Sequence, residues 1–203
     1  AGTSMQREKE FIPIRIPLLK GLLGYRVLII KKDKLKLFES INTFDDFKKL
    51  KACQGTHWPD TKILEDAGIN VVKNTNYELM FLQVQNDRCD YFPRGIHEAF
   101  SEIESRKEKY PNLMIFDKLI IYYPFPMYFF VSNENKILAK RVEKGLLNII
   151  NDGSFDNYIK QHEVTRHLFP INNWINTKTF KLDNLNISKD TDLKNDKFWI
   201  FLK

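Results

Sequence analysis

Residues 51–64, KACQGTHWPDTKIL, decide the fold that we expect for this chain. A strand over residues 52–55, a turn of small residues and a helix over residues 59–68 follow one another without a gap. Such a junction directs backbone N–H groups and the positive end of the helix dipole beyond the strand. The stretch therefore predicts a binding site for an anion, such as a carboxylate, at the turn.

Strands and helices alternate on both sides of this stretch. An apolar run at residues 27–30 is typical of a buried strand, and Thr43 is placed to cap a short helix. Further strands are expected at residues 70–75 and 88–93, and further helices at residues 76–85 and 95–110. This order predicts parallel sheets built from strand–helix–strand units.

The composition changes in the second half of the chain. Residues 113–132 are rich in aromatic and β-branched types and contain two prolines, which predicts two strands joined by a kink between two sheets. Two helices are expected next, at residues 134–153 and 154–162. The residues that follow show little periodicity. We expect them to wrap the surface, held by Trp174, Trp199 and Phe201.

The composition is typical of a folded protein, because the 203 residues are 43% hydrophobic and 29% charged. The formal net charge of +6 is compatible with an anionic partner, but the densest basic cluster, residues 31–37, alternates with leucines. That spacing favours a half-buried strand, so no nucleic-acid partner is expected. No apolar run reaches the roughly 20 residues that span a bilayer.

No sequence pattern supports an enzyme or a metal site. Gly-rich nucleotide loops and the nucleophile elbow of serine hydrolases are absent, and neither cysteine has the downstream arginine of a phosphatase loop. The four histidines are too scattered to bind a metal. We therefore expect no catalytic residue, no cofactor and no metal.

The chain has two cysteines, Cys53 and Cys89. Both fall on expected strands, where a free thiol behaves as a small apolar side chain. Buried free thiols are therefore the default expectation, and a disulfide between the two stays open as the alternative.

Four segments, taken in order, carry a resemblance to a known family. Residues 4–30 match a Ser/Thr-x-x-Arg segment that leads through prolines into an apolar strand, and residues 43–60 match a strand that ends in Gly-Thr. Residues 86–95 match a Gly-Arg-x-Asp-Ala strand, and residues 126–159 match a returning strand with its helices. Over about residues 3–163, the chain resembles the extracytoplasmic solute-binding proteins of the bacterial amino-acid-binding type, family 3.

Within that family, the chain is similar to a subgroup known only as transporter substrate-binding-domain proteins. The shared segments are GxxGYR, WPDT and YFPRG, which are residues 21–26, 58–61 and 91–95 of this chain.

The resemblance implies an α/β fold of the two-lobed type 2 periplasmic binding class, with parallel sheets flanked by helices. It places residues 1–31 and 124–203 in a first lobe and residues 32–123 in a second lobe. Few residues precede Ser4, so the first lobe is expected to be incomplete. An incomplete sheet has an open edge, and we expect association with another copy through it.

The resemblance also implies which residues bind the ligand. In the family, the arginine of the first segment binds the α-carboxylate of the ligand, and Arg7 holds that position. A guanidinium can donate two parallel hydrogen bonds to a carboxylate. Gly55 and Thr56 match the anion-binding turn of the second lobe.

The two residues after this turn depart from the family, which often has small hydroxyl residues there. His57 is expected to add a hydrogen bond or a pH-dependent charge, and Trp58 an apolar wall. Asp60 and Thr61 are expected to cap the following helix rather than to contact the ligand.

The segment around Arg94 also departs from the family. The aspartate that receives a ligand's amino group belongs at position 95, which is Gly95 in this chain, beside Arg94. A cation cannot pair with an ammonium group. The sequence therefore predicts a ligand with two anionic ends, or one without an amino group.

The function implied by the resemblance is binding of a small, carboxylate-bearing solute in a cleft between two lobes, for uptake by an ABC-type membrane transporter. An extracytoplasmic sensing domain of a signalling protein, or an enzyme on the same scaffold, stays open as the alternative. The expected location is the periplasm, and the chain itself contains no signal-peptide pattern. The expected ligand-binding residues are Arg7, Gly55, Thr56, His57, Trp58 and Arg94.

Overall fold

The protein divides into two compact units in the computed structural model, which describes residues 1–202. The first unit contains Ala1–Gly24, Pro124–Asn176 and Asn184–Lys203, and the second contains Tyr25–Tyr123 and Thr177–Asp183. Both combine helices and strands, so the α/β class predicted from the sequence is confirmed. Within residues 1–202, no helix is both long enough and apolar enough to cross a membrane.

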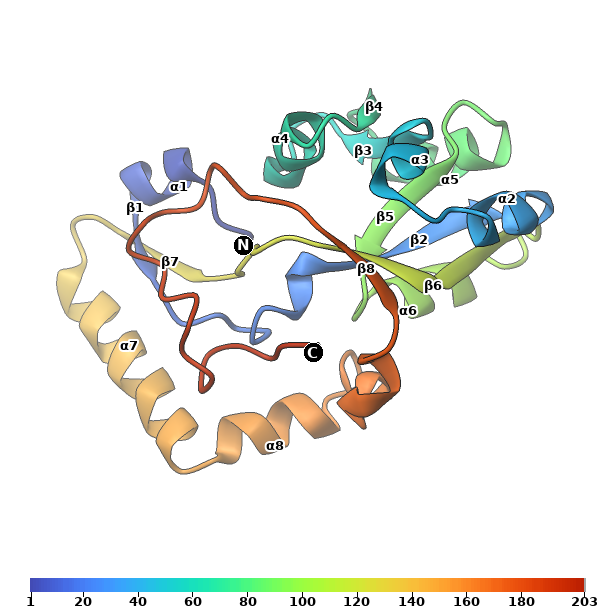
Figure 1. The fold of residues 1–203 in the computed structure, drawn as a ribbon. Helices are drawn as coiled ribbons and strands as arrows, with labels where there is room; N and C mark the ends of the chain where they lie inside the picture. Colours follow the sequence, from blue (N-terminus) through green and yellow to red (C-terminus); the bar gives the residue numbers. More distant parts are fainter. Residues whose placement is uncertain (203) are drawn as a thin grey trace. The chain divides into compact units, whose positions relative to one another are not determined.

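A six-stranded sheet forms the centre of the second unit (Figure 1). Its strand order is β4 (Asn70–Asn74), β3 (Lys51–Gly55), β5 (Tyr91–Gly95), β2 (Tyr25–Lys31), β6 (Leu113–Tyr122) and β8 (Lys178–Lys181). Strand β2 is antiparallel to both of its neighbours, and the other five strands run in one direction. The sheet is therefore mainly parallel, as the alternation of strands and helices predicts.

Short helices flank this sheet. They are α2 (Leu35–Glu39), α3 (Phe44–Lys48), α4 (Pro59–Asp66), α5 (Tyr77–Gln85) and α6 (Ala99–Glu104), with a 3-10 turn at Lys32–Lys34. Thr43 caps α3 as predicted, in a capping box with Asp46. Gly68 follows α4 with a φ of +80°, a conformation in which glycine is favoured at a helix end.

The first unit contains a two-stranded antiparallel sheet of β1 (Phe11–Ile14) and β7 (Phe129–Ser132). Its helices are α1 (Met5–Glu10), α7 (Lys136–Asn151) and α8 (Ser154–Gln161), with 3-10 turns at Leu22–Gly24, Arg166–Leu168 and Ile171–Trp174. One cluster of buried side chains in this unit consists of Ile14, Ile16, Val131, Ala139 and Leu146.

Trp199 anchors the C-terminal segment to the first unit, as the sequence predicts. It is buried, and its indole N–H donates a hydrogen bond of 2.7 Å to the Asp192 carbonyl. The ring covers Gly21, where a Cβ atom would lie 2.3 Å from it. Gly21 also has a φ of +79°, so a larger residue would be strained there for two reasons.

Two strands differ from the sequence prediction. Residues 1–31 were expected in the first lobe, but β2 is a central strand of the second unit, hydrogen-bonded to β5 and β6. Residues 178–181 were expected to wrap the surface, but they form β8 beside β6 in the same sheet. Both corrections have one cause, since each strand pairs with residues far away in the sequence.

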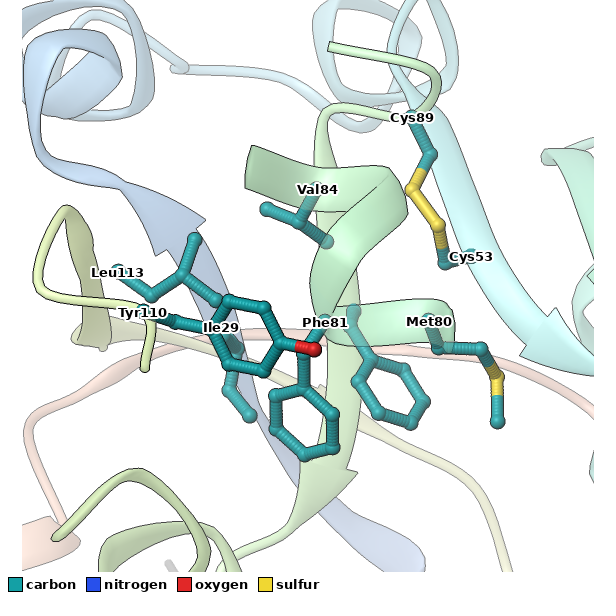
Figure 2. Close-up of a cluster of buried hydrophobic side chains, with 9 residues drawn as sticks. Ile29, Cys53, Met80, Phe81, Val84, Cys89, Tyr110 and Leu113 are labelled. Atoms are coloured by element: carbon teal, nitrogen blue, oxygen red, sulfur yellow. A yellow bond between two sulfur atoms is a disulfide. The ribbon is translucent and has the colours of Figure 1, made fainter. Parts of the chain in front are cut away.

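A disulfide joins Cys53 and Cys89 in the core of the second unit (Figure 2). The default expectation of free thiols is therefore wrong, and the alternative holds. The two Cα atoms are 5.6 Å apart, a separation that a disulfide spans. The bond ties β3 to the loop that precedes β5. The buried side chains around it are Ile29, Met80, Phe81, Val84, Phe92, Tyr110 and Leu113.

Replacing both cysteines with alanine is expected to lower the free energy of unfolding by about 2–4 kcal/mol, because the bond restricts the unfolded chain. The restriction is large here, since the two cysteines are 36 residues apart. Urea denaturation followed by circular dichroism measures the change. Adding a reductant should destabilise the wild-type protein and leave the double variant unchanged. Equal urea midpoints for the two proteins would show that the bond contributes nothing.

Candidate functional site

The candidate site lies at the carboxyl ends of β3 and β5 in the second unit. These parallel strands end at Gly55 and Gly95, so the turns that follow them leave from the same edge of the sheet. Strand β2 begins at this edge, since Arg26 is the register partner of Gly95. In open α/β sheets, ligands bind outside the carboxyl ends of the strands.

Hydrogen bonds within the protein already occupy several polar groups of the turn after β3. The Thr56 N–H donates to the Asn74 carbonyl at 2.9 Å, and the Trp58 N–H donates to the Gly55 carbonyl at 3.1 Å. The Thr61 hydroxyl donates to the same Gly55 carbonyl at 2.6 Å, instead of capping α4. The anion-binding site predicted at this turn therefore has fewer N–H and O–H donors available to a ligand than expected.

The Trp58 indole covers Gly55. A Cβ atom at Gly55 would lie 2.5 Å from the indole, so a larger residue would displace the ring. Trp58 also packs against Phe92 and Tyr77, with ring centroids 6.1 and 6.2 Å away. The apolar wall that Trp58 forms thus faces side chains of its own unit. His57, next to it, is exposed.

Asp60 is a buried carboxylate rather than the helix cap that the sequence predicts. Its Oδ2 atom pairs with Arg26 Nη2 at 3.0 Å, and each side chain is only 3% exposed. The same oxygen accepts hydrogen bonds from the Gln54 amide at 3.1 Å and the Tyr123 hydroxyl at 3.0 Å. Helix α4 begins after Trp58 and has no side-chain cap, which leaves Asp60 free to turn inward.

Ion pairs continue from Arg26 along the edge of the sheet. Arg26 Nη1 lies 3.5 Å from Glu98 Oε1, and Arg94 Nη2 lies 2.9 Å from the same oxygen. Arg94 also donates two parallel hydrogen bonds to Glu102, at 2.8 and 2.7 Å. We name these residues the ion-pair chain: Asp60, Arg26, Glu98, Arg94 and Glu102.

The ion-pair chain carries a net charge of −1, because three carboxylates face two guanidiniums. The nearby cations Arg106 and Lys109 share one carboxylate, Glu78. Glu98 is the most exposed member of the ion-pair chain, with 27% of its side chain exposed. The edge of the sheet therefore presents one partly exposed carboxylate, Glu98.

Arg94 is enclosed by aromatic rings as well as by carboxylates. Its guanidinium carbon lies 5.0, 5.3 and 5.1 Å from the ring centroids of Trp58, Tyr77 and Phe92. Burial opposes the charged form, but the hydrogen bonds to Glu102 and the negative charges nearby outweigh burial and raise the pKa of Arg94. Arg94 therefore stays charged and is held by groups of the protein itself.

Two tyrosine hydroxyls complete the hydrogen bonding of the carboxylates. Burial raises the pKa of Tyr123 well above its usual value, so the hydroxyl keeps the proton that it donates to Asp60. Burial and a hydrogen bond with Glu102 raise the pKa of Tyr77. Both tyrosines thus act as neutral donors at the two ends of the ion-pair chain.

Gly95 leaves room for the carboxylate of Glu98. A Cβ atom at residue 95 would lie 2.9 Å from Glu98 Oε1 and 2.7 Å from the His97 ring. The Gly95 N–H donates to the same Glu98 oxygen at 3.1 Å. A carboxylate oxygen of Glu98 therefore occupies space beside Gly95 that a side chain at position 95 would need.

Arg7 lies in α1 of the first unit and is half-buried. Its Nη1 atom donates to the Gly2 carbonyl, and its guanidinium carbon lies 5.8 Å from the ring centroid of Phe130. Ser4, which begins the Ser/Thr-x-x-Arg segment, accepts a hydrogen bond of 3.2 Å from the Arg7 N–H and so caps α1.

The predicted ligand residues are divided between the units. Arg7 lies in the first unit, and the others lie together at the ends of β3 and β5 in the second: Gly55, Thr56, His57, Trp58 and Arg94. Arg26 and the three carboxylates of the ion-pair chain were not predicted. One signal was present, because Glu98 and Glu102 are four residues apart, a spacing that puts both on one face of a helix. Among residues 1–202, no cluster of three His, Cys, Asp or Glu residues could hold a metal ion.

Asp60→Asn is expected to lower the free energy of unfolding by about 3 kcal/mol, because buried Arg26 would lose its nearer counter-charge and keep only the more distant Glu98. Asp66→Asn is the matched control on the same helix, since Asp66 pairs with the exposed Lys62. Its expected cost is at most about 1 kcal/mol. Urea denaturation of both variants measures the difference. An equal loss in the free energy of unfolding would show that the buried ion pair stabilises the protein no more than the exposed one.

Comparison with known proteins gives matches among solved structures. No family model and no curated protein matches the chain. An ancestral arginine-binding protein bound to arginine is 20% identical, with a TM-score of 0.56 over 79% of this chain and 68% of that one. An ancestral arginine-binding protein bound to glutamine is 17% identical, with a TM-score of 0.58 over 80% and 68% of the two chains.

A third similar structure is a binding component of an ABC transporter from Wolinella succinogenes, complexed with lysine. It is 14% identical, with a TM-score of 0.57 over 79% of this chain and 66% of that one. Identities this low establish the fold alone. The chain has the fold of the periplasmic amino-acid-binding proteins, as the resemblance in its sequence predicts.

Proposed function

We propose that the chain is a solute-binding protein whose ligand is a small amino acid or a related compound. One observation carries this proposal: the ion-pair chain is a net negative group with one partly exposed carboxylate, Glu98. The fold, which the chain shares with amino-acid-binding proteins, supports it. In this proposal, Glu98 receives the amino group or another cationic group of the ligand.

Glu98 has acceptor capacity left for a ligand. Its Oε1 atom faces Arg26 and Arg94 and accepts the Gly95 N–H. Its Oε2 atom lies 3.8 Å from the His97 ring nitrogen, which is too far for a hydrogen bond. An ionised carboxylate offers about four lone-pair sites, so Oε2 can accept from a cation.

Arg94 does not support the ligand with two anionic ends that the sequence suggests. Its guanidinium is already bound by Glu102 and Glu98, so it is not a vacant cation. The ligands of the three compared structures are arginine, glutamine and lysine, and each has both an amino group and a carboxylate. We therefore propose a ligand with at least one cationic group beside its carboxylate.

The predicted site residues take different roles in this proposal. Arg7 binds the carboxylate, a role that rests on the family resemblance alone. Thr56, half-buried, and His57, exposed, contact the ligand at the end of β3. Trp58 packs over Gly55 and holds the turn, and Arg94 positions Glu98.

We also propose that the chain works outside the cytoplasm with a membrane transporter or a receptor. The disulfide between Cys53 and Cys89 supports this location, because disulfides persist in oxidising compartments. The Wolinella succinogenes structure supports the partner, since it is described as a binding component of an ABC transporter.

Isothermal titration calorimetry with lysine, arginine and glutamine tests the proposed function. At least one of the three is expected to bind the wild-type chain. Glu98→Gln is expected to weaken that binding by about 10–100-fold, because the variant loses one charge-assisted hydrogen bond to the ligand.

Glu104→Gln is the matched control, since Glu104 ends the helix that Glu98 precedes, is exposed and pairs with Lys107. This variant is expected to bind like the wild-type chain. If no amino acid binds, the proposed function is wrong. If an amino acid binds and Glu98→Gln leaves its affinity unchanged, the role of Glu98 is wrong while the function stands.

A further inference from the structure

We propose that Glu102, acting through Arg94, determines whether the candidate site selects a cationic or an anionic group of its ligand. The inference rests on the proposed function and adds a specificity-determining residue to it. Glu102 lies on α6, four residues after Glu98, a spacing that places the two carboxylates side by side. Both pair with the guanidinium of Arg94, but their contacts with it differ.

Glu102 is the main partner of Arg94. Its carboxylate oxygens accept hydrogen bonds from Arg94 Nε at 2.8 Å and from Arg94 Nη2 at 2.7 Å, and this two-point contact fixes the orientation of the guanidinium. Glu98 has one contact with Arg94, in which its Oε1 atom lies 2.9 Å from Nη2. The side chain of Glu102 is 14% exposed, against 27% for Glu98. Glu102 therefore holds Arg94 within the protein, and Glu98 lies nearer the solvent.

The charge of Glu102 keeps Arg94 from neutralising Glu98. Within residues 1–202, the carboxylates that pair with Arg94 are Glu98 and Glu102. Without the charge of Glu102, Arg94 would face Glu98 alone, and Arg26 would face the same Glu98 oxygen from 3.5 Å. Two guanidiniums beside one carboxylate weaken its attraction for a cationic group and attract an anionic one. Loss of the Glu102 charge should therefore change which ligand the site prefers.

Arg106 increases the need for a carboxylate at this position. Its Nη1 atom donates to the Glu102 carbonyl at 3.1 Å, so a second guanidinium lies close to the Arg94–Glu102 pair. Arg106 and Lys109 have one carboxylate, Glu78, between them. Without Glu102, the positive charges in this part of the second unit would outnumber the carboxylates that pair with them.

Calorimetric titration of Glu102→Gln with lysine, arginine, glutamine and glutarate tests the role of Glu102. The variant keeps the shape of the side chain and removes its charge. Compared with the wild-type chain, the amino acid of highest affinity is expected to bind more weakly and glutarate more tightly. The ratio of their Kd values should shift by at least about tenfold towards glutarate. Glu104→Gln is the matched control on α6, and its ratio is expected to equal that of the wild-type chain.

A merely structural role for Glu102 predicts another result, because damage to the site would weaken both ligands together. An unchanged ratio, or glutarate binding that weakens or stays undetectable in Glu102→Gln, would therefore overturn the role of Glu102 while the proposed function stands. If no amino acid binds the wild-type chain, the proposed function is wrong and the role of Glu102 is wrong with it.

A double variant, Arg94→Gln with Glu102→Gln, decides if circular dichroism shows that Glu102→Gln does not fold. It removes one positive and one negative charge, so neither member of the pair is left buried without its partner, and Glu98 keeps its own charge. The double variant is expected to bind the amino acid more tightly than glutarate, even where both affinities fall. A double variant that binds glutarate more tightly would overturn the proposal.

Discussion

The ion pair between Asp60 and Arg26 is the interaction on which the candidate site depends. Both side chains are almost fully buried, and a buried charge is strongly destabilising without its partner. The pair connects the first turn of α4 with β2, the strand that runs against the other five. Gln54 and Tyr123 donate to the same carboxylate oxygen. Three separate parts of the sequence therefore meet at one atom: Arg26, the stretch from Gln54 to Asp60, and Tyr123.

From Arg26 onwards, each charge fixes the position of the next. Glu98 lies between two guanidiniums, and Arg94 is held between Glu102 and three aromatic rings. The ion-pair chain contains three carboxylates and two guanidiniums, and Glu98 is its most exposed member. The edge of the sheet therefore offers an acceptor, where the sequence alone suggested a vacant cation. Because the available charged group is a carboxylate and not a cation, the proposed ligand is an amino acid and not a ligand with two anionic ends.

Features that depend on near neighbours could be predicted from the sequence, and those that depend on distant ones could not. Thr43 caps α3 and Gly68 ends α4 because both act on residues of their own turn. Strand β8, the central place of β2 and the disulfide all join distant segments, which local patterns do not encode. At the site, Arg94 was recognised as a cation, but its effect depends on Glu98 and Glu102, and only the folded chain shows that both carboxylates reach it.

The central claim is that the site binds a cationic group, and calorimetric titration with glutarate beside the amino acids tests it most directly. Glutarate has two carboxylates and no amino group, so it represents the ligand with two anionic ends. We predict that the amino acid with the highest affinity among lysine, arginine and glutamine binds at least about tenfold more tightly than glutarate. Tighter binding of glutarate than of all three amino acids would contradict the account.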